Sequence, residues 1–136
     1  MLPEHLRDLV AAHLPVIASA EAGPTVADLT NAPYLDRWIA MREFTGRIVL
    51  SGDVTGHPLL HDTGIVTSQL FGIDAHAGWA RTLSRWYRLG RPLAPDKREL
   101  PDPFGFRPLA NPDVLAAALA AHADEIRRLA AEARDQ

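Results

Sequence analysis

Residues 47–92 decide the fold class and read RIVLSGDVTGHPLLHDTGIVTSQLFGIDAHAGWARTLSRWYRLGRP. Arg47–Thr55 alternates with a period of two, which is typical of a half-buried strand. Ile65–Asp74 is rich in β-branched and aromatic residues and follows a turn signal at Asp62-Thr63-Gly64. Gly56-His57-Pro58 cannot continue a central strand, because proline has no amide hydrogen to donate to the ladder. The stretch therefore predicts short strands joined by tight turns.

Two further segments extend this pattern. Trp38–Phe44 alternates with a period of two and predicts another strand. Trp79–Leu89 follows a turn at Ala77-Gly78 and fits either a strand or a helix by spacing alone. We favour the strand, because its neighbours are strands and Gly90 ends it. One continuous strand places Arg81, Arg85 and Tyr87 on the same face.

The two ends of the chain predict helices. Leu2–Ala20 carries apolar residues at spacings of three and four, and we expect Pro15 to end or kink this helix. Thr25 fits the N-cap of a short second helix, with Asp28 in the capping-box position. Asn111-Pro112-Asp113 opens a long helix that runs to about Arg134, with asparagine as N-cap and proline at the first helical position.

These elements indicate an α+β fold, a small antiparallel meander or partly closed barrel of about four strands covered on one side by the N- and C-terminal helices. We expect a single domain over 1–136, with a helical part (1–35), a strand-rich core (37–90), a proline-rich connection (91–111) and a final helix (112–134). The apolar stripe of the final helix is expected to pack on the sheet. Pairing with another helix, including a homodimer through it, is the alternative.

The composition excludes several classes of protein. The chain has 136 residues, a net charge of −3 and no cysteine, which rules out disulfides, thiolate zinc sites and cysteine nucleophiles. Its apolar runs are shorter than the roughly 20 residues of a membrane span, and its N-terminus lacks a signal pattern. We therefore expect a cytoplasmic protein that makes no membrane contact. No cofactor motif is present, and no cofactor is expected.

Basic charge is concentrated in one segment. Residues 81–98 hold six basic residues against one acidic residue, although the whole chain is negative. Arginine and aromatic side chains are the usual anchors of protein interfaces, and they also hold phosphates and stack on bases. The alternative is that the arginines pair with acidic helices of the same chain while Trp79 and Trp86 are core. The predicted binding surface comprises Arg81, Arg85, Tyr87, Arg88 and Arg91.

Enzymatic alternatives rest on the histidines near the turns. Ser68 with His57 or His61 and Asp62 supplies the residue types of a nucleophilic triad, but no Gly-x-Ser-x-Gly elbow accompanies them. The set His57, His61, Asp62, Asp74 and His76 has ligand chemistry for zinc or iron, yet Pro58 forbids the helix on which such a spacing is most convincing. We instead expect Gly56, His57 and Pro58 to form a structural turn, and we expect no metal.

The core segment resembles a family of small uncharacterised bacterial proteins catalogued as a domain of unknown function. The resemblance covers roughly 37–92 and rests on Leu50–Pro58, Asp62–Gly64, Ile65–Ser68 and Trp79–Gly90. It implies a small strand-rich module and no activity. The sequence thus favours a non-enzymatic binding or regulatory protein that acts on a protein partner, for example an inhibitor from a mobile element or a defence system. A nucleic-acid-binding accessory protein is the first alternative. A small hydrolase or metal-dependent enzyme that uses the region of His57, His61 and Asp62 is the second alternative.

Overall fold

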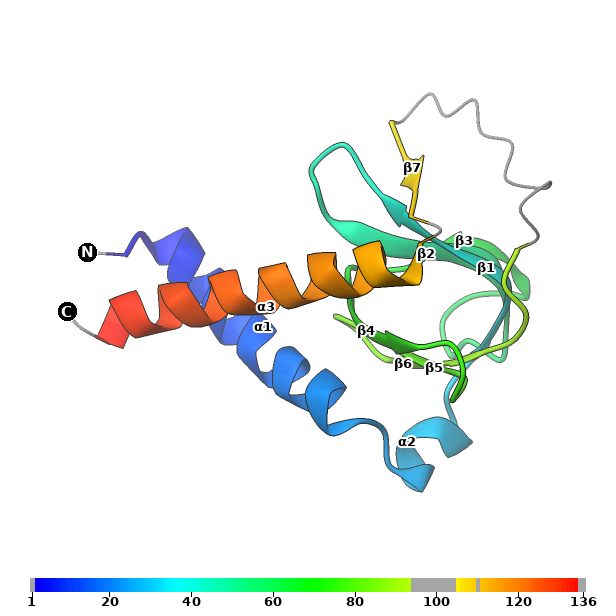
Figure 1. Cartoon of the computed structure of the whole chain (residues 1–136). Coiled ribbons are helices and arrows are strands. Elements are labelled where there is room, and N and C mark those ends of the chain that lie inside the picture. The colour runs from blue at the N-terminus through cyan, green and yellow to red at the C-terminus, as the bar shows by residue number, and fades with distance from the viewer. Residues whose placement is uncertain (1, 94–104, 110, 135–136) are drawn as a thin grey trace.

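The structure is a computed structural model that describes residues 2–93, 105–109 and 111–134. Three helices and seven strands make up the described chain (Figure 1). In chain order they are α1 (Glu4–Ala22), α2 (Val26–Thr30), β1 (Tyr34–Arg42), β2 (Ile48–Thr55), β3 (Thr63–Val66), β4 (Leu70–Asp74), β5 (Trp79–Thr82), β6 (Trp86–Leu89), β7 (Arg107–Pro108) and α3 (Pro112–Arg134).

One mixed sheet has the strand order β3-β2-β1-β6-β5-β4, with β7 paired to β1. Two antiparallel meanders, β1–β3 and β4–β6, are joined where β1 runs parallel to β6, with Tyr34 opposite Arg88. The α+β class is confirmed, but the expected count of four strands is wrong. Each of the segments Ile65–Asp74 and Trp79–Leu89 contains a turn, so the described sheet has more strands, and it does not close.

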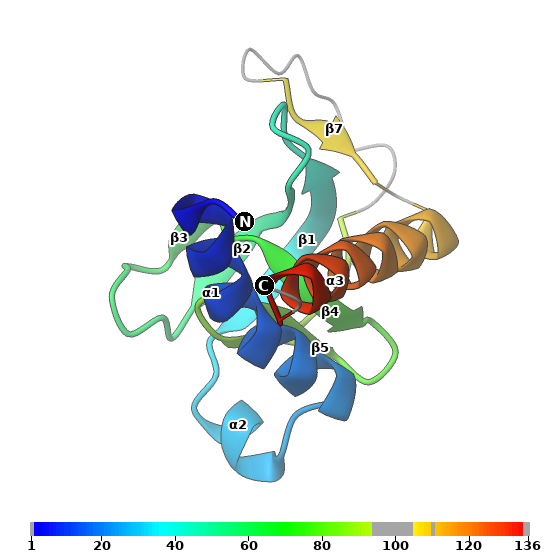
Figure 2. The ribbon, with the colours of Figure 1, turned by 90° about the vertical axis from the view of Figure 1, so that its left-hand side faces the viewer.

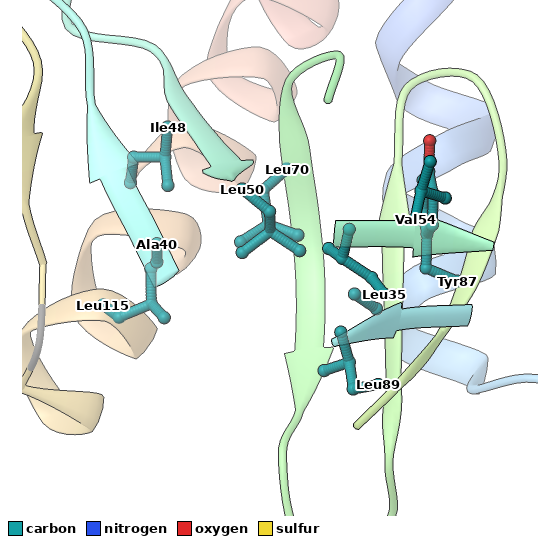
Figure 3. Close-up of a cluster of buried hydrophobic side chains, with 10 residues drawn as sticks. Leu35, Ala40, Ile48, Leu50, Val54, Leu70, Tyr87, Leu89 and Leu115 are labelled. Atoms are coloured by element: carbon teal, nitrogen blue, oxygen red, sulfur yellow. The ribbon is translucent and has the colours of Figure 1, made fainter. Parts of the chain in front are cut away.

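The main core lies between the curved halves of the sheet. Leu35, Leu50 and Leu70 are at most 1% exposed and come from β1, β2 and β4. Figure 3 shows these side chains meeting at the centre, with Tyr87 and Leu89 of β6 beside them. Ile48, Leu50 and Val54 of β2 are thus buried in this core, while Val49 on the opposite face is buried with Ile39 and Met41.

Helices α1 and α3 cross on one side of the sheet (Figures 1 and 2). α1 continues through Pro15, so of the two expected outcomes, an end or a kink of the helix, the end is wrong. Val16 and Ile17, just beyond the proline, are buried against Ile126 and Leu129 of α3. This packing compensates for the backbone hydrogen bond that proline cannot donate. The stripe of α3 thus packs mainly on another helix of the same chain, while Leu115 reaches the main core.

Both predicted helix starts are confirmed. The Thr25 hydroxyl accepts the Asp28 amide at 3.0 Å, and the Asp28 carboxylate accepts the Thr25 amide at 2.8 Å, a complete capping box. Asn111 Oδ1 accepts the amide of Asp113 at 2.9 Å and begins α3. Across the described parts of the chain, no helix combines the length and apolarity needed to cross a membrane.

Candidate functional site

The turn between β5 and β6 is built by a buried threonine. Thr82 is fully buried, and its amide donates to the Arg85 carbonyl at 2.9 Å. The Arg85 amide in turn donates to the Thr82 hydroxyl at 3.3 Å. These contacts reverse the chain over Leu83 and Ser84 without glycine or proline. A turn of this kind has no strong sequence signal. For this reason the sequence predicts one continuous strand over Trp79–Leu89.

A second turn, between β3 and β4, lies directly beside it. Thr67 Oγ1 accepts the buried Leu50 amide at 3.0 Å, where β3 leaves the β2 ladder. Ser68 Oγ then accepts the Ser84 amide at 3.2 Å, and the Gln69 carbonyl accepts the Leu83 amide at 2.8 Å. The Thr67-Ser68 pair therefore joins the two turns, and the Ser68 hydroxyl contacts backbone here.

The β5–β6 pairing determines which side chains share a face. Arg81 lies opposite Trp86, and Ala80 lies opposite Tyr87. Directly opposed residues of an antiparallel pair project to the same side, so Trp86 accompanies Arg81. Tyr87 projects into the core and is 3% exposed (Figure 3). The predicted shared face of Arg81, Arg85 and Tyr87 is therefore wrong, because the intervening turn changes the alternation.

Arg81 and Arg85 nevertheless meet at one hollow of about 240 Å³, which we call the arginine hollow. It lies between the end of α2 and the β5–β6 turn, and the Gly-His-Pro turn adds one wall through Pro58. Sequence reasoning missed Trp86 and the residues from α2, because only the folded chain brings residues 28–33 to the turn. The lining residues are Asp28, Asn31, Ala32, Pro33, Pro58, Arg81, Ser84, Arg85 and Trp86.

Arg81 is held in the hollow with part of its charge desolvated. Its guanidinium lies over the Trp86 ring at 5.5 Å from the centroid, in cation–π geometry. Its Nε is buried and has no hydrogen-bond partner among the described residues. Burial lowers the pKa of Arg81, and the nearby Asp28 carboxylate partly opposes this shift. Asp28 itself already accepts the Thr25 amide in the capping box.

Arg85 lines the hollow, and His57 precedes the lining residue Pro58 in the Gly-His-Pro turn. The Arg85 guanidinium makes no hydrogen bond or ion pair with any residue that the structure describes. His57 Nδ1 accepts the Leu59 amide at 3.0 Å inside the turn, and its ring lies 6.4 Å from that of Tyr87. Burial lowers the pKa of His57, and so does the charge of Arg85. Burial and the charge of Arg85 therefore both disfavour the protonated form of His57.

The remaining two arginines of the predicted surface are used within the fold. Arg88 donates from Nε to the Ala32 carbonyl at 2.9 Å and lies over the Tyr34 ring. Arg91 forms an ion pair with Asp36 at 3.2 Å, and the Arg91 amide donates to the same carboxylate. The structure thus places Arg81 and Arg85 in the lining of the hollow. Arg88 borders it through the Ala32 carbonyl, and Arg91 is paired with β1.

The residues of the enzymatic alternatives do not converge. Asp62 Oδ1 accepts the Gly56 amide at 3.3 Å and closes the β2–β3 loop. Asp74 Oδ1 accepts the Ala77 amide at 2.8 Å in a different turn. In the described parts of the chain, no three histidine, aspartate or glutamate side chains gather where they could hold a metal ion. Neither the triad nor the ligand set is assembled by these residues.

Comparisons with known proteins place the chain in a family. No curated protein and no solved structure matches it. A family model, described as a family of unknown function (DUF6634), matches residues 6–106. This range holds both turns and every lining residue of the arginine hollow. The resemblance to a family without assigned activity is thereby confirmed, and the chain belongs to the family of unknown function DUF6634.

Proposed function

We propose that this protein is a non-enzymatic binding module that holds an acidic side chain of a protein partner in the arginine hollow. The observation that carries the proposal is that Arg81 and Arg85 line one hollow and neither forms an ion pair within the described chain. Arg91, by contrast, has its carboxylate in Asp36. Pairing with the protein's own acidic groups therefore explains the position of Arg91, and it leaves Arg81 and Arg85 available to bind a carboxylate from a partner.

The chemistry of the hollow suits a carboxylate. A guanidinium presents donors in a planar fork that matches a carboxylate, and such charge-assisted hydrogen bonds are among the stronger ones in proteins. The stack on Trp86 fixes the plane of Arg81 before a partner arrives, so less side-chain freedom is lost on binding.

Exposed apolar side chains beside the hollow support a protein as the partner. Val26 is 87% exposed on α2, and Leu59, next to Pro58, is 78% exposed. Protein interfaces are enriched in aromatic residues and arginine, and apolar side chains form much of their buried area. Occupying a partner's surface in this way is also how a small inhibitor acts, which is the narrower role suggested by the sequence. The nucleic-acid alternative rests on the same two arginines and on Trp86.

The test follows the indole N–H signals of the ¹⁵N-labelled protein during titration with a blocked tri-glutamate peptide. We expect a saturable shift of the Trp86 signal, while Trp38, whose N–H donates to the Gly90 carbonyl at 3.1 Å, stays unchanged as an internal reference. Arg85→Gln should remove the Trp86 shift. The matched control Arg7→Gln, at an exposed position of α1, should keep it.

A second titration, with a single-stranded DNA oligonucleotide, separates the two partner classes. Tighter DNA binding that falls steeply between low and physiological salt would favour the nucleic-acid alternative. A Trp86 shift of equal size in wild type and Arg85→Gln would show that the hollow does not recognise the carboxylate.

A further inference from the structure

A larger cavity lies where α1 and α3 diverge from their crossing. It measures about 590 Å³ and lies between the C-terminal half of α1, the N-terminal half of α3 and strands β1, β4 and β5. In Figure 1 the two helices cross and then diverge, α1 toward α2 and α3 toward β7. Three aromatic residues, Trp38, Phe71 and Trp79, line the side formed by the sheet.

Three of the side chains that α3 places in the lining are alanines, and they lie beside the larger Leu115 and Leu119. Ala116, Ala120 and Ala123 follow one another at spacings of four and three, so they share one helix face, and all three line the cavity. Further along α3, Ile126 and Leu129 fill the corresponding space against α1. Larger residues at the alanine positions would fill the cavity in the same way.

The sheet approaches α1 closely at the edge of this space. A Cβ added at Gly72 would lie 2.8 Å from the Cβ of Ala20, so α1 already touches β4 there. The helix cannot move toward the sheet to close the cavity without displacing this contact. The open volume is therefore bounded by backbone packing on one side and by alanines on the other.

The space is a pocket that opens to solvent on one side, because Ala116 and Ala120 in its lining are exposed. Water gains few hydrogen bonds from walls made of aromatic and aliphatic side chains. Small-molecule sites, in contrast, occupy roughly 300–1,000 Å³ and are lined mainly by apolar and aromatic residues. Size and lining both match that class of site.

The charges at the cavity define the class of ligand. Glu21 is the one ionisable residue among the described residues that line it, and an ion pair with Arg127 of α3 already neutralises this carboxylate. The indole N–H of Trp38 is also committed, to the Gly90 carbonyl. We infer that this cavity binds an uncharged, mainly hydrocarbon small molecule, held by contact with Trp38, Phe71 and Trp79. This site has a different lining from the arginine hollow, and the two adjoin where Trp79 packs edge-to-face on Trp86 at 5.5 Å between ring centroids.

The test uses the full-length chain and the uncharged fluorescent probe N-phenyl-1-naphthylamine. We expect saturable fluorescence enhancement with wild type. Ala120→Leu, which places a larger side chain in the cavity, should weaken the affinity by about tenfold or more, equivalent to roughly 1.4 kcal/mol. The matched control Ala121→Leu, at the next and exposed position of the same helix and not in the lining, should bind as wild type does.

The sulfonated analogue 8-anilinonaphthalene-1-sulfonate tests the chemical class. The inferred site should bind it more weakly than the neutral probe, because no unpaired cation lines the described cavity. Equal or tighter binding of the sulfonate would overturn the inference. So would an unchanged affinity in Ala120→Leu, or no binding of the neutral probe by the wild-type chain.

Discussion

Thr67→Val removes one hydroxyl from the end of the β2–β3 ladder and keeps the shape of the side chain. In the wild type this hydroxyl accepts the Leu50 amide at 3.0 Å and donates to the Ser68 carbonyl at 2.8 Å. Leu50 is fully buried, so its N–H has no access to water when the hydroxyl is lost. A buried donor left without a partner costs about 1–3 kcal/mol.

Valine is β-branched like threonine and leaves no void, so packing should not add to this cost. We therefore expect the free energy of unfolding, measured by urea denaturation and circular dichroism, to fall by about 1–3 kcal/mol. For a chain of this size that corresponds to a Tm lower by roughly 3–15 °C.

Two controls isolate the hydroxyl. Thr67→Ser keeps the acceptor and should lose less stability than Thr67→Val. Thr63→Val removes an exposed hydroxyl from β3, the strand that precedes Thr67, and should change stability by no more than about 0.5 kcal/mol. A Thr67→Val protein within about 0.5 kcal/mol of wild type would refute the reasoning, because Leu50 would then have found another acceptor.

The other two predictions concern pH and a close backbone approach. His13 Nδ1 and His122 Nε2 lie 3.0 Å apart between α1 and α3, and burial lowers the pKa of both from the ordinary value of 6.5. The unfolded chain therefore binds more protons than the folded chain below that value. For this reason the urea midpoint should fall as the pH drops from 7.5 to 5, and it should fall less steeply in His122→Gln. Equal slopes of the urea midpoint against pH in the two proteins would contradict this. Gly90→Ala should lower the free energy of unfolding by at least about 2 kcal/mol, because the new Cβ would overlap the Tyr34 hydroxyl. Gly64→Ala is the control and should change the free energy of unfolding little, because the nearest atom to its new Cβ lies at 3.7 Å. A Gly90→Ala protein as stable as Gly64→Ala would be the contrary result.

The sequence predicted best the features that depend on neighbouring residues. The Thr25 capping box and the Asn111 N-cap are formed by side chains within three residues of the amides they accept, so their signal is local. The positive φ of Gly78 similarly belongs to the predicted Ala77-Gly78 turn. Pro15 shows the limit of local reasoning, because the packing that keeps α1 continuous comes from α3, at the other end of the chain.

The candidate sites depended on contacts that a single segment does not contain. Once the Thr82–Arg85 turn is recognised, cross-strand pairing places Trp86 beside Arg81, but a buried threonine hydroxyl gives no turn signal in the sequence. The alanines of the cavity are good helix formers wherever they occur, so their spacing does not reveal that they face an open space. Only the tertiary arrangement distinguishes Ala120 from Ala121.

The single parallel pairing between β1 and β6 has a consequence for how the chain folds. All other pairings within β1–β3 and β4–β6 join strands that are neighbours in the sequence, so each meander can form by closing short loops. The pairing of Tyr34 with Arg88 spans both meanders and must wait for them to meet. The meanders β1–β3 and β4–β6 should therefore exchange their amide hydrogens as two cooperative units. The β1–β6 pairing between them should be the last contact made on folding and the first lost in partial unfolding.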